Sequence, residues 1–215
     1  MRIDQQFTKF NDLLFKAIPA IKGKYMTFES VGLMDGFMER TYAYEFYHQL
    51  RKFQDELNYN DFTIHAEPQK ARTKFLHRIL ERLEEERLEN EHIDDFQKRV
   101  MPDLLVHVPD NLNENVAIVE IKPDKGLSWD RKGIKKDIRV LKEFVSGGND
   151  DDGYYKGILL LYSTSNGFND AEIIKKNYSE IIKDTLGNNW YDYSQKIDLL
   201  WHHKVGTQPK NITWE

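Results

Sequence analysis

The chain has 215 residues, 40% of them hydrophobic, which is enough for one substantial core but makes two separate domains cramped. We therefore expect a single domain over residues 1–215. The net charge of −5 argues against a surface coated with nucleic acid, although a local basic patch remains compatible with it. Cysteine is absent, which excludes disulfides and thiolate metal ligands.

No apolar run approaches the ~20 residues that a membrane-spanning helix needs. The N-terminal stretch MRIDQQFTKFNDLLFKAIPAIKGK also lacks the uninterrupted apolar segment of a signal peptide. The expectation from these two observations is a cytoplasmic protein with no membrane partner.

The first predicted elements are a helix and a strand. Residues 38–58 are expected to be helical, because Phe46, Leu50, Phe53 and Leu57 recur at helical spacing. The alternating, β-rich stretch FTIHAE at residues 62–67 predicts a strand that Pro68 ends.

A long charged segment follows, at about residues 70–99, and its pattern predicts a helix. Leu76, Ile79, Leu80 and Leu83 lie on one side, and Glu and Arg residues fall at helical-neighbour spacings. The pattern is typical of a solvated helix with one core-facing stripe. The alternative is a contact surface for a second copy of the chain or for another protein.

The second half of the chain alternates strands and helices. DLLVHV (103–108) and VAIVEI (116–121) predict two strands joined by a turn, and so an antiparallel pair. A helix is expected from Asp130 to Val145, an almost wholly apolar central strand at KGILLLYS, a helix from Ala171 to Leu186 and a last strand at KIDLLWHHKV. This order predicts an α/β fold with a central mixed sheet flanked by helices, a core at about 38–203 and a helical insertion at about 70–99.

Two carboxylates and a lysine stand at the ends of the predicted strand pair. Glu120 and Lys122 share one face of their strand, because side chains alternate with period two, and hairpin pairing brings Asp103 close to them. Buried without partners, such charges would be costly, and an ion pair at a strand end is the simplest way to compensate them. A hard divalent cation with oxygen ligands is the alternative.

Pro102-Asp103 followed by Glu120-Ile121-Lys122 resembles the signature of the PD-(D/E)XK nuclease superfamily, which has the restriction-endonuclease-like fold. The flanking stretches MERTYAYEFYHQLR, FTIHAE and WDRKGIKKDIRVLKEFV resemble the family's leading helix, first strand and the helix after the core motif. The resemblance covers roughly residues 38–162, and the charged segment before Pro102 departs from it as an insertion.

The resemblance implies a Mg²⁺-dependent nuclease, with Mn²⁺ as a substitute, that hydrolyses phosphodiester bonds in DNA. Asp103, Glu120 and the carbonyl of Ile121 would bind the ion, and Lys122 would orient the attacking water. The family also has members that have lost activity, so a binding or scaffold protein on the same fold is the second hypothesis. Fold likeness alone does not decide between them.

Helix phase selects the acid of the leading helix. Glu39 lies seven residues before Phe46 and so on nearly the same face as the apolar stripe, whereas Glu45 is about 100° away from it. We therefore expect Glu39 to join the site as an accessory acid.

Basic residues gather on the helix expected from Asp130 to Val145. Lys132, Lys136 and Arg139 lie opposite its apolar stripe and are expected either to contact DNA phosphates or to form a solvated face.

Three further motifs give weaker indications of a functional site. His65-Ala66-Glu67 is similar to the H-x-E of zinc deaminases, but the cysteine ligands are missing. Glu67 is expected to be an exposed acid at the strand end, with an accessory acid beside the metal site as the alternative. His202 and His203 point to opposite faces of a strand, which makes them a poor chelate and favours a surface or partly packed pair. Residues 146–153 (SGGNDDDG) predict a flexible loop rather than a calcium loop, because the regular ligand spacing is missing.

Overall fold

The computed structural model describes residues 2–26, 35–66, 102–109, 115–124, 131–146, 153–164 and 168–214. Within these ranges six strands form one sheet in the order β1-β2-β3-β4-β5-β6. The strands are β1 Thr63–Ala66, β2 Leu104–His107, β3 Asn115–Asp124, β4 Lys156–Ser163, β5 Ile197–His202 and β6 Lys210–Asn211. The sheet is mixed, because β3, β4 and β5 run parallel whereas β1, β2 and β6 pair antiparallel with their neighbours.

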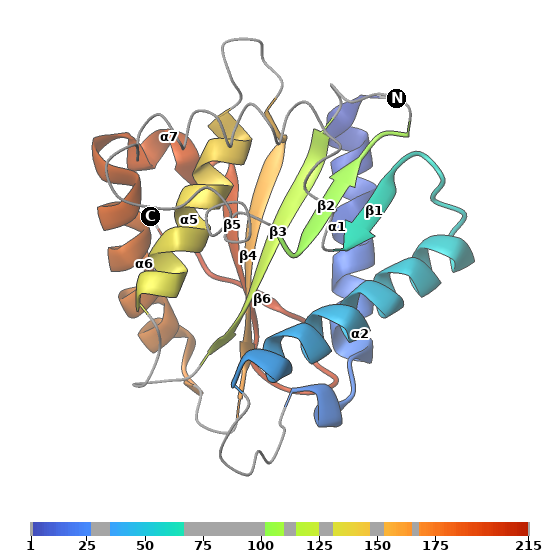
Figure 1. Ribbon diagram of the computed structural model, residues 1–215, viewed down its shortest axis with the longest axis horizontal. Coiled ribbons are helices and arrows are strands. Elements are labelled where there is room, and N and C mark those ends of the chain that lie inside the picture. Colours follow the sequence, from blue (N-terminus) through green and yellow to red (C-terminus); the bar gives the residue numbers. More distant parts are fainter. Residues whose placement is uncertain are drawn as a thin grey trace, which may run out of the picture.

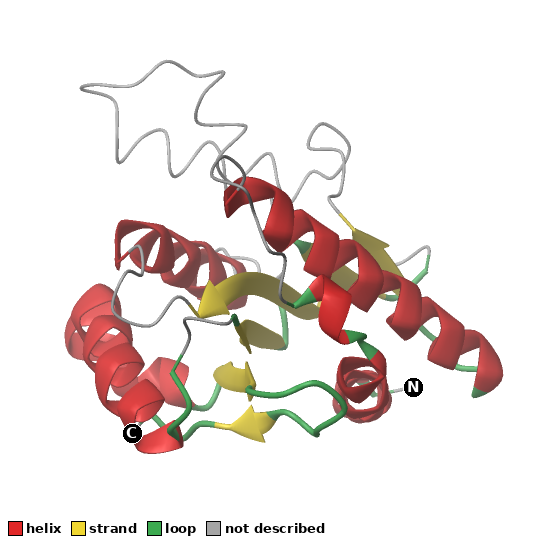
Figure 2. Ribbon diagram, turned by 90° about the horizontal axis from the view of Figure 1, so that it is seen from below, coloured by secondary structure: helices red, strands yellow, loops and turns green. Residues whose placement is uncertain are grey.

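Helices cover both faces of this sheet (Figures 1 and 2). They are α1 Ile3–Ala20, α2 Asp35–Glu56, α5 Arg131–Ser146, α6 Ala171–Leu186 and α7 Trp190–Ser194. Leu159 and Leu161 of β4 pack with α5 and α6, whereas Ile158 and Leu160 pack with α1 and α2. Both faces of the central strand are therefore buried, and the architecture is α/β with an open mixed sheet between helical layers.

Several sequence expectations are confirmed. β4 coincides with the predicted strand KGILLLYS and is buried from Gly157 to Ser163, and α6 has the predicted bounds. The predicted antiparallel pair of β2 and β3 is present, with Leu104 opposite Val119. The predicted stripe of α5, from Ile134 to Val145, is buried against the sheet.

The N-terminal helix α1 was not among the sequence expectations. It buries Phe10, Leu13, Leu14, Ala17 and Ile18 on the face of the sheet that α2 also covers. These residues recur at three- and four-residue spacing, so α1 is amphipathic and extends the core before residue 38.

The expected helical insertion at 70–99 lies outside the described residues.

Within the described ranges, no helix is long and apolar enough to cross a membrane.

The end of α2 is fixed by a buried glutamine. Asn58 has φ 53°, in the left-handed region that lets a helix terminate, and the chain turns there toward β1. The side-chain nitrogen of Gln54 donates to the carbonyls of Tyr59, at 2.9 Å, and Phe62, at 2.8 Å. Arg51 donates in turn to the amide oxygen of Gln54 at 3.1 Å. One side chain therefore replaces the missing backbone partners of this turn.

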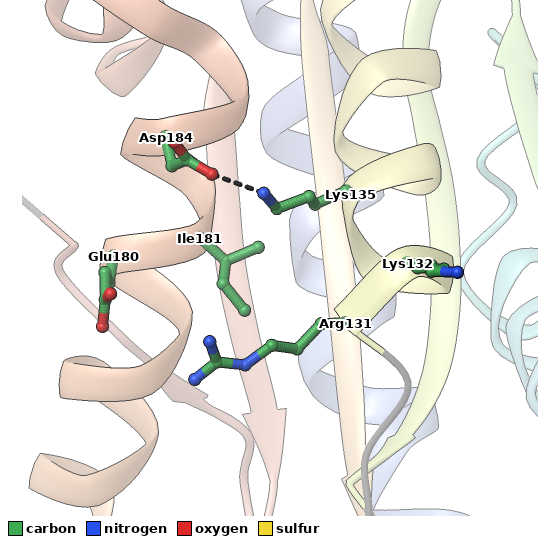
Figure 3. A pocket seen from close by; sticks show the side chains of 6 residues that line it. All are labelled: Arg131, Lys132, Lys135, Glu180, Ile181 and Asp184. Carbon is green, nitrogen blue, oxygen red and sulfur yellow. Dashed lines mark hydrogen bonds and ion pairs between the residues drawn. The ribbon is translucent and has the colours of Figure 1, made fainter.

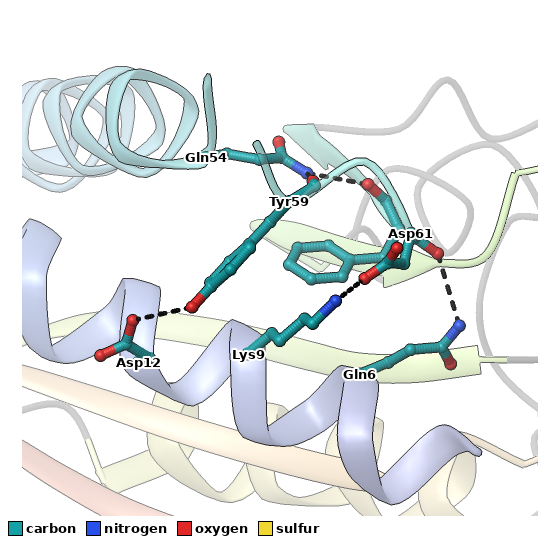
Figure 4. A network of polar contacts seen from close by, with 7 residues as sticks. Gln6, Lys9, Asp12, Gln54, Tyr59 and Asp61 are labelled. Atoms are coloured by element: carbon teal, nitrogen blue, oxygen red, sulfur yellow. Dashed lines mark hydrogen bonds and ion pairs between the residues drawn. The ribbon is translucent and has the colours of Figure 1, made fainter. Parts of the chain in front are cut away.

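The same turn anchors α1 (Figure 4). Lys9 forms an ion pair with Asp61, and Gln6 donates to the carbonyl of Asp61 at 3.4 Å. The hydroxyl of Tyr59 contacts the carboxylate of Asp12 at 3.4 Å. Polar contacts thus join α1 to the connection between α2 and β1.

We predict that Gln54→Leu lowers the free energy of unfolding by about 1–3 kcal/mol, because it leaves the carbonyls of Tyr59 and Phe62 without their donor. Urea denaturation measures the change. Gln5→Leu, at an exposed position of α1, is the control and should stay within about 0.5 kcal/mol of wild type. Equal effects of the two substitutions would contradict this role for Gln54.

Candidate active site

The acids of β2 and β3 meet where β2 begins. Leu104 pairs with Val119, so one further step of the antiparallel register brings Asp103 opposite Glu120. The backbone N–H of Ile121 donates to Oδ2 of Asp103 at 2.6 Å. A strand residue points its N–H and C=O toward the same neighbouring strand, so the Ile121 carbonyl faces the Asp103 side as well.

Lys122 joins the two helical layers at this end of the sheet. Its Nζ lies 2.5 Å from Oε1 of Glu39 on α2 and 3.5 Å from Oδ2 of Asp137 on α5. β3 and β4 are parallel, with Lys122 opposite Leu161, so the cluster lies toward their carboxyl ends. Ligands commonly bind at this edge of open α/β sheets.

The structure thus brings together the four side chains that the sequence nominated, namely Glu39, Asp103, Glu120 and Lys122. Glu45 instead accepts a hydrogen bond from Gln49, one turn further along α2, at 2.8 Å. The helix phase that selected Glu39 therefore agrees with the packing of α2.

Asp137 is the member of the cluster that sequence reasoning missed. It lies on the buried stripe of α5, three residues after Ile134 and four before Leu141, and is only 3% exposed. A carboxylate inside an otherwise apolar helical stripe is the signal that could have identified it.

Burial and mutual repulsion disturb the acids of the cluster. Burial raises the pKa of Asp103 from its ordinary 3.8 to about 7, against the opposing effects of Lys122 and the Ile121 N–H. Burial likewise raises the pKa of Asp137 to about 6, although Lys122 and Lys136 oppose it. The pKa of Glu120 is raised well above its usual range by burial and then by the charges of Asp137 and Asp103.

The lysine responds in the opposite direction. Burial alone would lower the pKa of Lys122, yet this pKa is raised above its ordinary value because carboxylates surround the ammonium group. In order of influence they belong to Asp137, Glu39, Glu120 and Asp103. Lys122 is therefore protonated at neutral pH, and the cluster holds more acids than one ammonium group can balance.

The donor set suits a hard divalent cation, since Asp103, Glu120 and the Ile121 carbonyl all offer oxygen atoms. In the described part of the chain, however, no three acidic or histidine side chains are grouped closely enough to hold an ion as they stand. Lys122 forms ion pairs with two of the acids. The chemistry of the residues fits a metal, and the binding of one would exchange part of the Lys122 contacts.

Some basic residues of α5 point toward α6, and others point away from it. Figure 3 shows the hollow between α5 and α6, about 440 Å³ in volume, with Arg131 and Lys135 directed toward α6 and Lys132 extending away from it. Lys135 pairs with Asp184 at 2.5 Å. The hydrogen bond from Lys135 lowers the pKa of Asp184, and the charge of Arg139 adds to this effect.

Of the three predicted phosphate contacts, Lys136 lies nearest to the cluster, because its charge acts on Glu120 and Asp137. Lys132 and Arg139 are exposed, and Arg139 is on the side of Asp184.

The two described histidine pairs, His65 with His107 and His202 with His203, lie outside the cluster. His65 stacks on His107 with ring centroids 4.8 Å apart, and Glu67 lies outside the described residues. The expected surface or partly packed histidine pair holds for His203, but His202 is fully buried. The Tyr42 hydroxyl lies 3.0 Å from Nδ1 of His202, and burial lowers the pKa of His202 to about 4. His202 packs in the core because it shares a face of β5 with Leu200, on the side of the sheet that α2 covers with Tyr42.

No protein-family model matches the chain, and neither the curated proteins nor the solved structures contain a match. The assignment of a function therefore depends on the geometry of the cluster itself.

We predict that the contribution of Asp103 to the free energy of unfolding of the metal-free protein falls as the pH rises from about 4 to about 7. Over this window the unfolded chain has lost the proton that the folded Asp103 carboxyl, with its pKa of about 7, retains. The folded state binds more protons, so raising the pH disfavours it. Relative to wild type, Asp103→Asn should gain stability across this window, as measured by urea unfolding in EDTA.

His202 contributes with the opposite sign, because its lowered pKa makes stability fall when the pH drops from about 6.5 to about 4. It is present in both proteins, so the difference between them isolates Asp103. A difference that stays constant with pH would show that the Asp103 carboxyl is not perturbed in this way.

Proposed function

We propose that the protein is a Mg²⁺-dependent nuclease with a restriction-endonuclease-like fold, acting on phosphodiester bonds in DNA. The observation that carries the proposal is the convergence of Asp103, Glu120 and Lys122 at the point where β2 begins beside β3. Glu39 completes the cluster from α2. These are the residues that the resemblance to the PD-(D/E)XK superfamily nominates.

In this proposal Asp103, Glu120 and the Ile121 carbonyl would hold the divalent ion, for which Mn²⁺ could substitute. Such an ion would supply Lewis-acid chemistry, which activates water and the phosphate toward hydrolysis. The hydrogen bond from Ile121 N–H fixes the orientation of the Asp103 carboxylate. One Asp103 oxygen is thereby committed to the backbone, and the other can face the ion.

Lys122 supplies charge and a hydrogen-bond donor. Its raised pKa keeps it protonated beside the acids, so it orients the attacking water rather than removing a proton from it. A fixed ammonium group also stabilises the negative charge that develops on the phosphoryl oxygens. Glu39, at 2.5 Å, positions this ammonium group.

The decisive experiment incubates the protein with plasmid and linear DNA in the presence of Mg²⁺, Mn²⁺ or EDTA. We expect cleavage that requires the ion and that falls by ~10²-fold or more in Asp103→Asn and Lys122→Met, the scale of losing one transition-state contact. Asp103→Asn keeps an acceptor for the Ile121 N–H, so the fold should survive. Cleavage unchanged in both variants would point to a contaminating nuclease and reject the proposal.

A non-catalytic binding or scaffold protein is the second candidate. The ion pairs of Lys122 favour it, because they tie α2 and α5 to the sheet without any reaction. In that case the wild type cleaves no DNA under any metal condition, and Lys122→Met lowers the unfolding midpoint instead.

Glu39 and Glu45 form a matched pair for mutation on one helix. We predict that Glu39→Gln reduces the cleavage rate by about 10-fold or more, because the Lys122 ammonium loses the partner that positions it. Glu45→Gln should be near neutral, since Glu45 contacts Gln49. Cleavage rates under single-turnover conditions report the effect, and the reverse pattern would show that Glu45 serves the site.

Lys132 and Lys136 are predicted to contact DNA phosphates. Replacing both with Ala should reduce the slope of log affinity against log salt by roughly one unit per lost contact. Lys135→Ala is the control, because Lys135 pairs with Asp184 on the side facing α6. Fluorescence anisotropy over a salt series provides the measurement. An unchanged slope in the double variant would assign these lysines to a solvated face.

A further inference from the structure

Asp137 is a buried acid on an otherwise apolar stripe of α5. It is 3% exposed, and Ile134, Ile138 and Leu141 on the same side of α5 pack in the core. An apolar residue there would complete the stripe without desolvating a charge. A buried carboxylate costs several kcal/mol unless its charge is compensated.

The compensation available to Asp137 is incomplete. Lys122 is 3.5 Å away and is held more closely by Glu39, while Lys136 acts on Asp137 from a partly exposed position. The cluster contains four carboxyl groups, those of Glu39, Asp103, Glu120 and Asp137, and two ammonium groups, those of Lys122 and Lys136. With all of them ionised, four minus two leaves two negative charges without a counter-charge, which is what one divalent cation supplies.

A second observation concerns the Asp137 carboxylate itself. Its Oδ2 atom is buried and has no hydrogen-bond partner among the described residues, and Nζ of Lys122 lies 3.5 Å from it, beyond the usual hydrogen-bond distance. A buried acceptor without a partner is costly, and a cation bound in the cluster would compensate it.

We propose that Asp137 belongs to the cation-binding site and contributes a carboxylate oxygen from α5, opposite Asp103 and Glu120 of the sheet. The inference rests on the proposed function, since it concerns the same ion. The cation takes over the compensation of Asp137, and Lys122 keeps its contact with Glu39. The metal site then joins α5 to β2 and β3.

Calorimetric titration with Mn²⁺ and with Mg²⁺, at neutral pH and without DNA, tests this directly. Asp137→Asn preserves the volume of the side chain and removes its charge. We expect the affinity for both ions to fall by about 10-fold or more, the scale of losing a group that holds a metal site. Asp184→Asn, which removes an exposed acid of α6, is the control and should bind as the wild type does.

A purely structural role makes a different prediction. If Asp137 is only the counter-ion of Lys122, Asp137→Asn changes the unfolding midpoint and leaves the metal affinity as it was. The titration is therefore repeated in a Lys122→Met background, where a further loss of affinity on adding Asp137→Asn supports the inference. Asp137→Ser serves as a second variant, and circular dichroism confirms that each protein is folded.

The outcomes separate the two proposals. A wild type that binds no divalent ion removes both the inference and the proposed function. A wild type that binds the ion and cleaves DNA, with unchanged affinity in Asp137→Asn and Asp137→Ser, overturns the inference alone.

Discussion

One ammonium group, that of Lys122, holds the two helical layers of this protein to the same end of the sheet. Its contacts reach Glu39 on α2 and Asp137 on α5, which pack on opposite faces. Because four carboxyl groups surround it, any change at Lys122 leaves buried negative charge without its nearest partner. The electrostatic balance at this end of the fold therefore depends on Lys122.

The mixed sheet explains why the acids converge. β3 is antiparallel to β2 and parallel to β4, so the beginning of β2 lies beside the carboxyl-terminal half of β3. Asp103 and Glu120 consequently face each other across one strand boundary. A wholly parallel sheet would place the start of β2 at the other end and separate them.

The cluster is not arranged for stability. Burial raises the pKa values of Asp103 and Asp137 to about 7 and about 6, so ionisation at neutral pH works against the folded state. Apolar residues at these positions would cost nothing of this kind. Violations of this sort concentrate at functional sites, where a ligand compensates the strain. The apolar layers on both faces of β4 provide the stability that tolerates such a site.

Local patterns in the sequence determined the strands β2 to β5, the bounds of α6, the apolar stripe of α5 and the shared face of Glu120 and Lys122. Each of these depends on periodicity within one segment, which residue order encodes directly. Only the tertiary structure decided that α1 completes the core, that His202 is buried, and that Glu39 and Asp137 meet at Lys122. Glu39 and Lys122 are 83 residues apart in the chain, and such contacts follow from how the helices pack on the sheet. A periodic pattern shows which face of a helix is buried, but it does not show which charged side chain of another element that face will contact.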